Sequence, residues 1–166
     1  FRGTARIVRG QPAGFKGRSE TKRDHTLWPR SPLAEVCPLT GSYVLIITLD
    51  TGRTIEVGAL GPREFPAGAY AYVGSAMGGL EARITRHLRE DKRLHWHVDY
   101  LLQHAEVAEV VRAESERRVE CEIAAALAER LPPVDAFGCS DCSCDAHLFG
   151  PAAYDVLCEA VEPAKP

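Results

Sequence analysis

The sequence lacks an apolar run of the roughly 18 residues that a membrane-spanning helix needs, and its first residues lack the apolar core of a signal peptide. We therefore expect a protein that has no membrane partner and works in the cytoplasm. Hydrophobic residues make up 45% of the chain and charged residues 26%, which is ordinary for a soluble globular domain. With 166 residues, the chain has room for one domain with a core of its own.

Two common phosphate-binding motifs are also missing. The chain contains neither the Gly-x4-Gly-Lys-Ser/Thr loop of P-loop proteins nor the G-x-G-x-x-G fingerprint of dinucleotide-binding folds. The nearest stretch is "GSAMGG", which has Gly74, Gly78 and Gly79 but no lysine. Nucleotide binding by either route is therefore not expected.

Charge is unevenly distributed, although the net charge is only −3. Residues 1–36 contain eight Lys or Arg against three Asp or Glu, whereas the remainder contains twelve against twenty. The first segment is rich in Gly, Pro, Ser and Thr, so it can bury too little apolar surface to offset its ordering entropy. We predict a disordered basic extension over 1–38, a folded domain over 39–160 and a flexible tail over 161–166. The extension is either an arm that binds nucleic acid by charge or a linker.

The hydrophobic pattern predicts strands first and helices later. The β-branched run over 43–49 is a strand buried on both faces, and an Asp-Thr-Gly turn followed by "TIEVG" suggests a hairpin. A third strand follows Pro66, and short connections make these strands antiparallel. "EVAEVVRA" is a fourth strand. Helices are predicted from Leu80, over "LHWHVDYLLQHA", from an N-cap at Ser115, and over "PAAYDVLCEAVE" with a proline in its first turn. This order indicates an α+β domain, a small and mainly antiparallel sheet of three to four strands flanked by helices.

The stretch "YAYVGSAMGGLEARITRHLRE" joins the third strand to the first predicted helix. Apolar residues recur at helical spacing from Leu80, and Arg83 and Arg86 alternate with them. In a purely structural interpretation, the glycines turn the chain from strand to helix, and the arginines lie on a solvated helix face. The stretch alone does not decide between this interpretation and a site.

Four segments, in order along the chain, resemble the GIY-YIG nucleases and most closely their Uri-type branch. The two strand motifs match "GSY" and "YVG", and the helix arginine matches Arg83. The "HWHxDYL" and "FGxSDCxCxxHLF" segments of the Uri-type branch match "HWHVDYLL" and "FGCSDCSCDAHLF". The resemblance covers 41–149 and implies a GIY-YIG-like fold.

The chain departs from the family pattern in two places. Ser42 stands where the motif name has isoleucine, and Tyr43 and Tyr72 are 29 residues apart, wider than in a compact hairpin. The intervening residues must form an inserted hairpin or a long loop. This insertion does not separate the two tyrosines if their strands pair side by side.

The resemblance implies a metal-dependent endonuclease that hydrolyses phosphodiester bonds of nucleic acid, with DNA as the expected substrate and repair or processing as the setting. Tyr43 and Tyr72 are candidates for the general base, with Tyr43 preferred. Arg83 would stabilise charge on the phosphate, and His87, one helical turn later, would bind phosphate or transfer a proton. Further substrate contacts are expected from Gly74, Ser75, Arg86, His97, Ser140 and Asp141.

The resemblance also implies one divalent ion, Mg²⁺ or Mn²⁺, on a glutamate, since Mg²⁺ is often held by one carboxylate together with waters and phosphate oxygens. The segment "ECE" offers Glu120 and Glu122 on the third predicted helix. Glu120 falls on the apolar stripe of Ile123 and Leu127, where a carboxylate is costly to bury without a cation. We therefore prefer Glu120. The alternative is that both are surface glutamates favoured by the helix dipole.

Cysteine and histidine are concentrated in one loop. The spacing C-x2-C-x-C-x2-H is formed by Cys139, Cys142, Cys144 and His147. In a cytosolic chain such residues are thiols or metal ligands rather than disulfides, and four soft ligands are enough for a closed zinc site. However, zinc modules usually join ligand pairs across a longer gap, and Cys139 lies outside the pattern shared with the family. His95 or His97 could complete a mixed site. Alternatively, the loop contacts DNA or the active site, or is held by structural hydrogen bonds.

A second interpretation of the whole chain is a non-catalytic nucleic-acid-binding module with a zinc-bearing Cys/His loop. A run of basic residues after Leu80 suits a phosphate backbone under either interpretation. A module without activity would be expected to lose Tyr43, Tyr72, Arg83 or the helix glutamate, and all are present. By analogy with fused relatives, a repair protein is a further expected partner.

Overall fold

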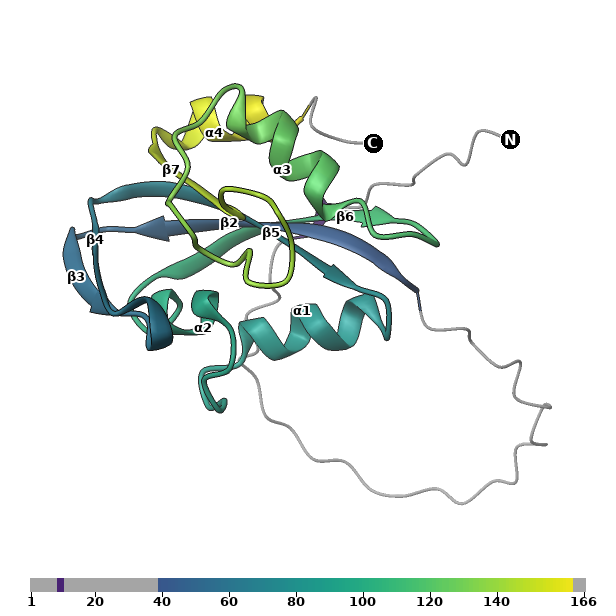
Figure 1. Cartoon of the computed structure of the whole chain (residues 1–166), viewed down its shortest axis with the longest axis horizontal. Coiled ribbons are helices and arrows are strands. Elements are labelled where there is room, and N and C mark those ends of the chain that lie inside the picture. Colours follow the sequence, from purple (N-terminus) through teal and green to yellow (C-terminus); the bar gives the residue numbers. More distant parts are fainter. Residues whose placement is uncertain (1–8, 11–38, 163–166) are drawn as a thin grey trace, which may run out of the picture.

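The computed structural model describes residues 9–10 and 39–162 (Figure 1). The predicted basic extension over 1–38 therefore lies outside the described residues, except for a two-residue strand at Arg9–Gly10. Most of the predicted tail also lies outside them. Within the described part of the chain, no helix is both long enough and apolar enough to span a bilayer.

Strands dominate the first half of the described chain and helices the second. In chain order the elements are β1 (Arg9–Gly10), β2 (Gly41–Leu49), β3 (Arg53–Glu56), the 3-10 turn η1 (Gly58–Leu60), β4 (Pro62–Phe65), β5 (Gly68–Ala76), α1 (Leu80–Leu88), α2 (His97–Leu101), β6 (Glu106–Glu114), α3 (Glu120–Ala128), β7 (Leu148–Ala152) and α4 (Tyr154–Val161).

The main sheet has the strand order β1-β6-β2-β5-β7, and every neighbouring pair is antiparallel. Helices α1 and α2 cover one face, and α3 and α4 cover the other (Figure 1). Four strands carry most of the pairing, and β1 adds two residues at one edge. The predicted α+β class, with a small antiparallel sheet flanked by helices, is confirmed.

Strand β2 lies at the centre of this arrangement and is buried on both faces, as predicted. Leu45 and Ile47 belong to the core beneath α1 and α2. Val44 and Ile46 belong to the core beneath α3 and α4. The alternation places every second side chain of β2 on the α1 face, and Tyr43 lies on that face.

The inserted residues form a hairpin of β3 and β4 that makes a two-stranded sheet of its own. β3 pairs with β4 rather than with β2, because both edges of β2 are already occupied by β5 and β6. Ile55 and Phe65 anchor the hairpin in the core beneath α1 and α2. The strands of Tyr43 and Tyr72 therefore pair side by side, and the insertion leaves them together.

Three sequence-based boundaries were wrong. Helix α3 begins at Glu120, because the Ser115 hydroxyl accepts the Arg117 N–H in a local turn instead of capping the helix. Strand β7 was not predicted, since its Gly150 and Pro151 argue against a strand. Pro151 is compatible with β7 because β7 is the edge strand of the main sheet, next to β5. On its outer side, Pro133 bridges to Phe149. Helix α4 begins after β7.

Candidate functional site

Tyr43 and Tyr72 lie on neighbouring strands and on the same face of the sheet. Tyr72 pairs with Leu45, two residues after Tyr43, so the two rings are diagonal neighbours. Tyr43 lies opposite Gly74, and a Cβ at that position would be 2.5 Å from the Tyr43 hydroxyl oxygen. A glycine is therefore needed at position 74 because any side chain there would collide with the Tyr43 ring. The predicted contact of Gly74 with substrate stays a prediction. Ser75 is paired with Ser42 one residue further along β5 and is partly exposed.

A chain of buried polar side chains runs from Tyr43 towards α2. The Tyr43 hydroxyl and His87 Nε2 are 2.8 Å apart. Asp99 Oδ1 lies 3.5 Å from His87 Nδ1, an ion-pair distance without hydrogen-bond alignment. The negative charge of Asp99 favours the tautomer protonated at Nδ1, which leaves Nε2 to accept a hydrogen bond from Tyr43.

The Asp99 carboxylate is held by α1 and by the start of α2. Burial alone would raise the pKa of Asp99, but His87, Arg86 and the backbone N–H groups of Trp96 and His95 lower it well below its usual range. Arg86 donates to both carboxylate oxygens, at 3.1 and 3.0 Å. His95 meets Asp99 through its backbone N–H at 2.9 Å, because α2 begins only at His97.

Two arginines of α1 lie over the Trp96 ring, with guanidinium carbons 4.2 Å (Arg83) and 4.1 Å (Arg86) from its centroid. Arg86 is also bound to Asp99 and to the carbonyl of Arg93, which is 2.7 Å away. Arg83 forms no salt bridge with the described residues. Arg83 is therefore available to an anion, whereas Arg86, expected to contact substrate, holds the site together.

Both tyrosines are poor acids in this setting. Burial raises the pKa of Tyr43, and the charge of Arg83 opposes this rise while Glu120 adds to it. Burial also raises the pKa of Tyr72, and Glu120 again adds to the rise. The carboxylate of Glu120 thus lies within electrostatic reach of both tyrosines, which remain protonated at neutral pH unless a base or cation assists.

Glu120 reaches the tyrosines because the start of α3 is fixed against β2. The N–H of Val119 donates to Ser42 Oγ at 3.3 Å, so the serine that departs from the family motif anchors the helix. Glu120 is 8% exposed and shares the buried stripe of α3, whereas Glu122 is exposed and bound to Arg117. The structure brings Glu120, and not Glu122, to the candidate site.

Arg118 connects the start of α3 to the cysteine-containing loop. Its Nη1 lies 3.8 Å from Glu120 Oε1 and 3.9 Å from Asp141 Oδ2. Asp141 and Ser140 are both exposed, and Asp141 reaches the site through Arg118. His97 is different, because its Nδ1 accepts the N–H of Gly138 at 3.0 Å and burial lowers its pKa. His97 therefore anchors the loop, and its contact with substrate stays a prediction.

A cluster of ligand-type side chains lies beside Glu120, and we call it the Cys3His cluster. Its ligand atoms all lie within 4.8 Å of one another, which is close enough to hold a metal ion. Its members are Cys121, Cys142, Cys144 and His147. The candidate ligand Cys139 was wrong, and Cys121 takes its place: the thiol of Cys139 donates instead to the carbonyl of Asp145, 3.5 Å away. Burial, with the neighbouring thiols of the cluster, raises the pKa of Cys144 to about 12.

Residues 42–165 match the sequence profile of a family described as Domain of unknown function DUF123. The chain belongs to the DUF123 family. No curated protein and no solved structure matches it. All the predicted site residues of this DUF123 chain, from Tyr43 to His147, lie inside the matched region.

Sequence reasoning missed four residues of this DUF123 site. Trp96 and Asp99 lie in the matched segment "HWHVDYLL" but are not among the candidate site residues that the sequence indicates. Neither are Arg118 and Cys121. Cys121 precedes Cys142 by 21 residues, and this is the longer gap that zinc modules usually show, so the spacing could have identified it.

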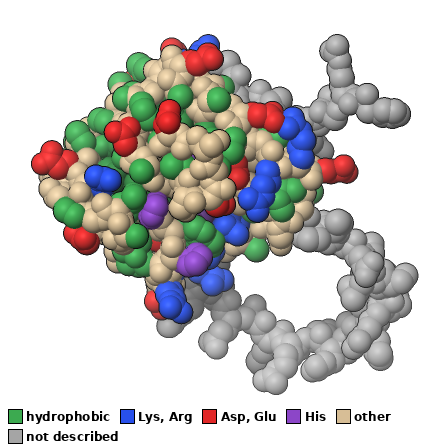
Figure 2. Space-filling view, viewed as in Figure 1, with side chains coloured by type: hydrophobic (Ala, Val, Ile, Leu, Met, Phe, Trp, Pro, Cys, Tyr) green, Lys and Arg blue, Asp and Glu red, His purple; other side chains and the backbone are tan. Residues whose placement is uncertain are grey.

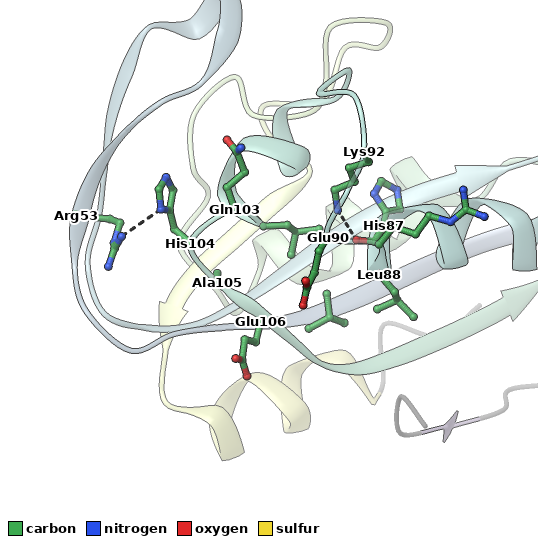
Figure 3. Close-up of a pocket in the computed structure, with 12 residues that line it drawn as sticks. Arg53, His87, Leu88, Glu90, Lys92, Gln103, His104, Ala105 and Glu106 are labelled. Carbon is green, nitrogen blue, oxygen red and sulfur yellow. Dashed lines mark hydrogen bonds between the residues drawn. The ribbon is translucent and has the colours of Figure 1, made fainter. Parts of the chain in front are cut away.

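A hollow of about 870 Å³ lies between the end of α1 with its following loop, the segment from α2 to β6, and Arg53 of β3 (Figure 3). In it, Arg53 is hydrogen-bonded to His104, and Lys92 donates to the His87 carbonyl. His87 lines the hollow, but Tyr43, Tyr72 and Glu120 do not. His87 therefore borders both the hollow and the DUF123 site. Figure 2 shows basic side chains exposed near α1 and α3.

Proposed function

We propose that this DUF123 protein is a metal-dependent nuclease that hydrolyses phosphodiester bonds of nucleic acid, with DNA as the expected substrate. The observation that carries the proposal is the convergence of five side chains from four elements, namely Tyr43, Tyr72, Arg83, His87 and Glu120. The resemblance to the Uri-type branch of the GIY-YIG nucleases supplies the expected reaction. A cytoplasmic location and a repair-protein partner belong to the same proposal.

Tyr43 is the proposed general base. As a water attacks phosphorus, the Tyr43 oxygen takes a proton from that water and passes its own hydroxyl proton to His87 Nε2, 2.8 Å away. Burial lowers the pKa of His87, which alone would oppose this transfer. Asp99, 3.5 Å from Nδ1, offsets part of this effect because its negative charge stabilises the imidazolium. Tyr72 is the alternative base. Among the described residues, its hydroxyl has no hydrogen bond to a histidine that could pass the proton on.

Arg83 is the proposed ligand of the phosphate. A guanidinium donates charge-assisted hydrogen bonds to the phosphate oxygens and stabilises the charge that builds up on them in the transition state. Trp96 supports the Arg83 guanidinium from one side, and Arg86 supports Trp96 in turn. Arg86 is therefore a positioning residue in this mechanism.

Glu120 fits a hard divalent cation such as Mg²⁺ or Mn²⁺. Its carboxylate is nearly buried, and its nearest described cation, Arg118, is 3.8 Å away and so beyond hydrogen-bond distance. A carboxylate in this state gains from a cation beside it, and Mg²⁺ needs few protein ligands because it keeps most of its waters. When bound, the ion would act as a Lewis acid on the phosphate.

The second candidate function is a non-catalytic nucleic-acid-binding module built on the same basic surface and the Cys3His cluster. A cleavage assay distinguishes the two. We would incubate the full chain with single-stranded, duplex and branched DNA and with RNA, in Mg²⁺ or Mn²⁺. The variants would be Arg83→Ala and, as a control, Arg89→Ala, which changes the exposed arginine that follows α1 as its C-cap.

We expect wild-type cleavage of at least one substrate, a loss of about 100-fold or more in Arg83→Ala and near-wild-type rates in Arg89→Ala. Equal rates in the two variants would refute the assignment of Arg83. Binding without cleavage of any substrate would favour the non-catalytic module.

A further inference from the structure

The Cys3His cluster is assembled from two separate parts of the fold. Cys121 lies in the first turn of α3, while Cys142 and Cys144 lie in the loop between α3 and β7, which we call the Cys loop (residues 138–147). His147 ends this loop and is fixed to the sheet, because its carbonyl accepts the Val73 N–H at 2.8 Å. Closure of the cluster therefore links α3 to the edge of the sheet.

The ligand atoms of the cluster are close enough together for one small ion with tetrahedral coordination. Zinc lies about 2.3 Å from thiolate sulfur and about 2.0–2.1 Å from imidazole nitrogen, so tetrahedral ligand atoms are roughly 3.6–3.8 Å apart. Cys142 Sγ and His147 Nε2 are already 3.5 Å apart. All four ligand atoms lie within 4.8 Å of one another, so sub-ångström to one-ångström movements would complete the tetrahedron.

The donor set decides between metals. Three sulfurs and one imidazole nitrogen are soft to borderline ligands that suit zinc, whereas Mg²⁺ and Mn²⁺ prefer oxygen. Four protein ligands leave no open coordination position for a water or a substrate. An ion held here would be structural, and it would be distinct from the ion proposed at Glu120.

We propose that Cys121, Cys142, Cys144 and His147 bind one structural Zn²⁺ that fastens the Cys loop to α3. The fastened loop contacts the candidate site directly: a Cβ at Gly138 would lie 3.1 Å from the Tyr72 ring, and Glu120 immediately precedes Cys121. Zinc therefore holds Glu120 and Tyr72 in a fixed relation. The importance of fixing Glu120 relative to Tyr72 rests on the proposed nuclease function, whereas the zinc site itself does not.

Elemental analysis of the purified full chain tests the site. We expect about one zinc per chain in the wild type, loss of most of that zinc in Cys121→Ser, and full retention in Cys139→Ser. Cys139 is the matched control, because it lies in the same loop but outside the cluster. Wild-type protein without stoichiometric zinc, or equal zinc content in the two variants, would overturn the proposal.

A measurement on the wild type avoids the risk that Cys121→Ser fails to fold. Protein exchanged into Co²⁺ should show the absorption of tetrahedral cobalt together with thiolate-to-cobalt charge transfer, and Cys139→Ser should show the same spectrum. An octahedral cobalt spectrum would overturn the site, as would a mass that reveals a disulfide among Cys121, Cys142 and Cys144.

The effect on Glu120 needs a separate readout. After zinc is stripped and the chelator removed, we expect the Mg²⁺ concentration for half-maximal cleavage to rise severalfold and to return when zinc is restored. An unchanged Mg²⁺ requirement would show that the Cys loop does not position Glu120. If the protein cleaves no substrate, the proposed function fails, but zinc content and the cobalt spectrum still decide the site.

Discussion

Substitution of Gly74 by alanine tests whether Tyr43 is held in the position that the relay requires. The added Cβ would lie 2.5 Å from the Tyr43 hydroxyl oxygen and 2.6 Å from the carbon that bears it. Tyr43 has little freedom to move, because it is 2% exposed and its hydroxyl is bound to His87. Either the ring or strand β5 must shift, and overpacking of this kind costs about 1–3 kcal/mol.

Part of that cost is offset, since replacing glycine restricts the unfolded chain by about 0.4–1 kcal/mol. We therefore expect the free energy of unfolding to fall by about 1–2 kcal/mol, which lowers the melting temperature by roughly 4–8 °C for a domain of this size. Thermal unfolding followed by circular dichroism measures this shift. In the nuclease assay, the displaced Tyr43 should also lower the cleavage rate.

Gly78→Ala is the matched control, because a Cβ at Gly78 would have no atom within 4 Å. We expect its melting temperature to stay within about 2 °C of the wild type, as for an exposed substitution without special contacts. Equal melting temperatures for Gly74→Ala and Gly78→Ala would refute the tight contact between Gly74 and Tyr43.

Three further substitutions test the polar contacts of the site. Asp99→Asn should destabilise the fold by about 2 kcal/mol, since it leaves His87 and Arg86 without their anion. The lowered pKa of Asp99 means that its stabilisation is present above about pH 4 and is lost as the pH falls towards the folded-state pKa, so acid unfolding should be shallower in Asp99→Asn. His87→Gln should keep the fold but lower the cleavage rate about 100-fold. Ser42→Ala should cost about 1–2 kcal/mol, because the Val119 N–H loses its acceptor.

A different result would contradict each of these three predictions. Identical acid unfolding curves for wild type and Asp99→Asn would show that the Asp99 carboxylate contributes nothing to stability. Unchanged cleavage by His87→Gln would remove His87 from the proton relay. Ser42→Ala with wild-type stability in urea unfolding would mean that Val119 finds another acceptor.

Helices and strands whose hydrophobic residues recur at a regular spacing could be predicted from the sequence. The β-branched run of β2 fits only a buried strand, and the apolar stripe of α3 is enough to distinguish Glu120 from Glu122. The resemblance of short motifs predicted that Tyr43, Tyr72 and Arg83 share one site. Strands β2 and β5 pair side by side although the β3–β4 hairpin separates them in sequence, and α1 follows β5 directly.

The features that could not be predicted depend on contacts between segments that are distant in the sequence. Cys121 joins Cys142 only because α3 packs on the sheet beside the end of β7, and the spacing inside the Cys loop favoured Cys139 instead. Strand β7 contains glycine and proline and is stabilised by pairing with β5 rather than by its own propensity. Helix α2 begins at His97, three residues after the start of the predicted segment "LHWHVDYLLQHA", because the Asp99 carboxylate accepts the His95 and Trp96 N–H groups in the turn before it.

The central claim is that Glu120 and the tyrosines beside it form a phosphodiesterase site, and one pair of isosteric variants tests it most directly. Glu120→Gln and Glu122→Gln remove one charge each from the same helical turn. We predict that wild type and Glu122→Gln cleave nucleic acid at similar rates in Mg²⁺, and that Glu120→Gln is at least about 100-fold slower, as expected when a metal-binding carboxylate is lost. Equal rates for Glu120→Gln and Glu122→Gln would contradict this account.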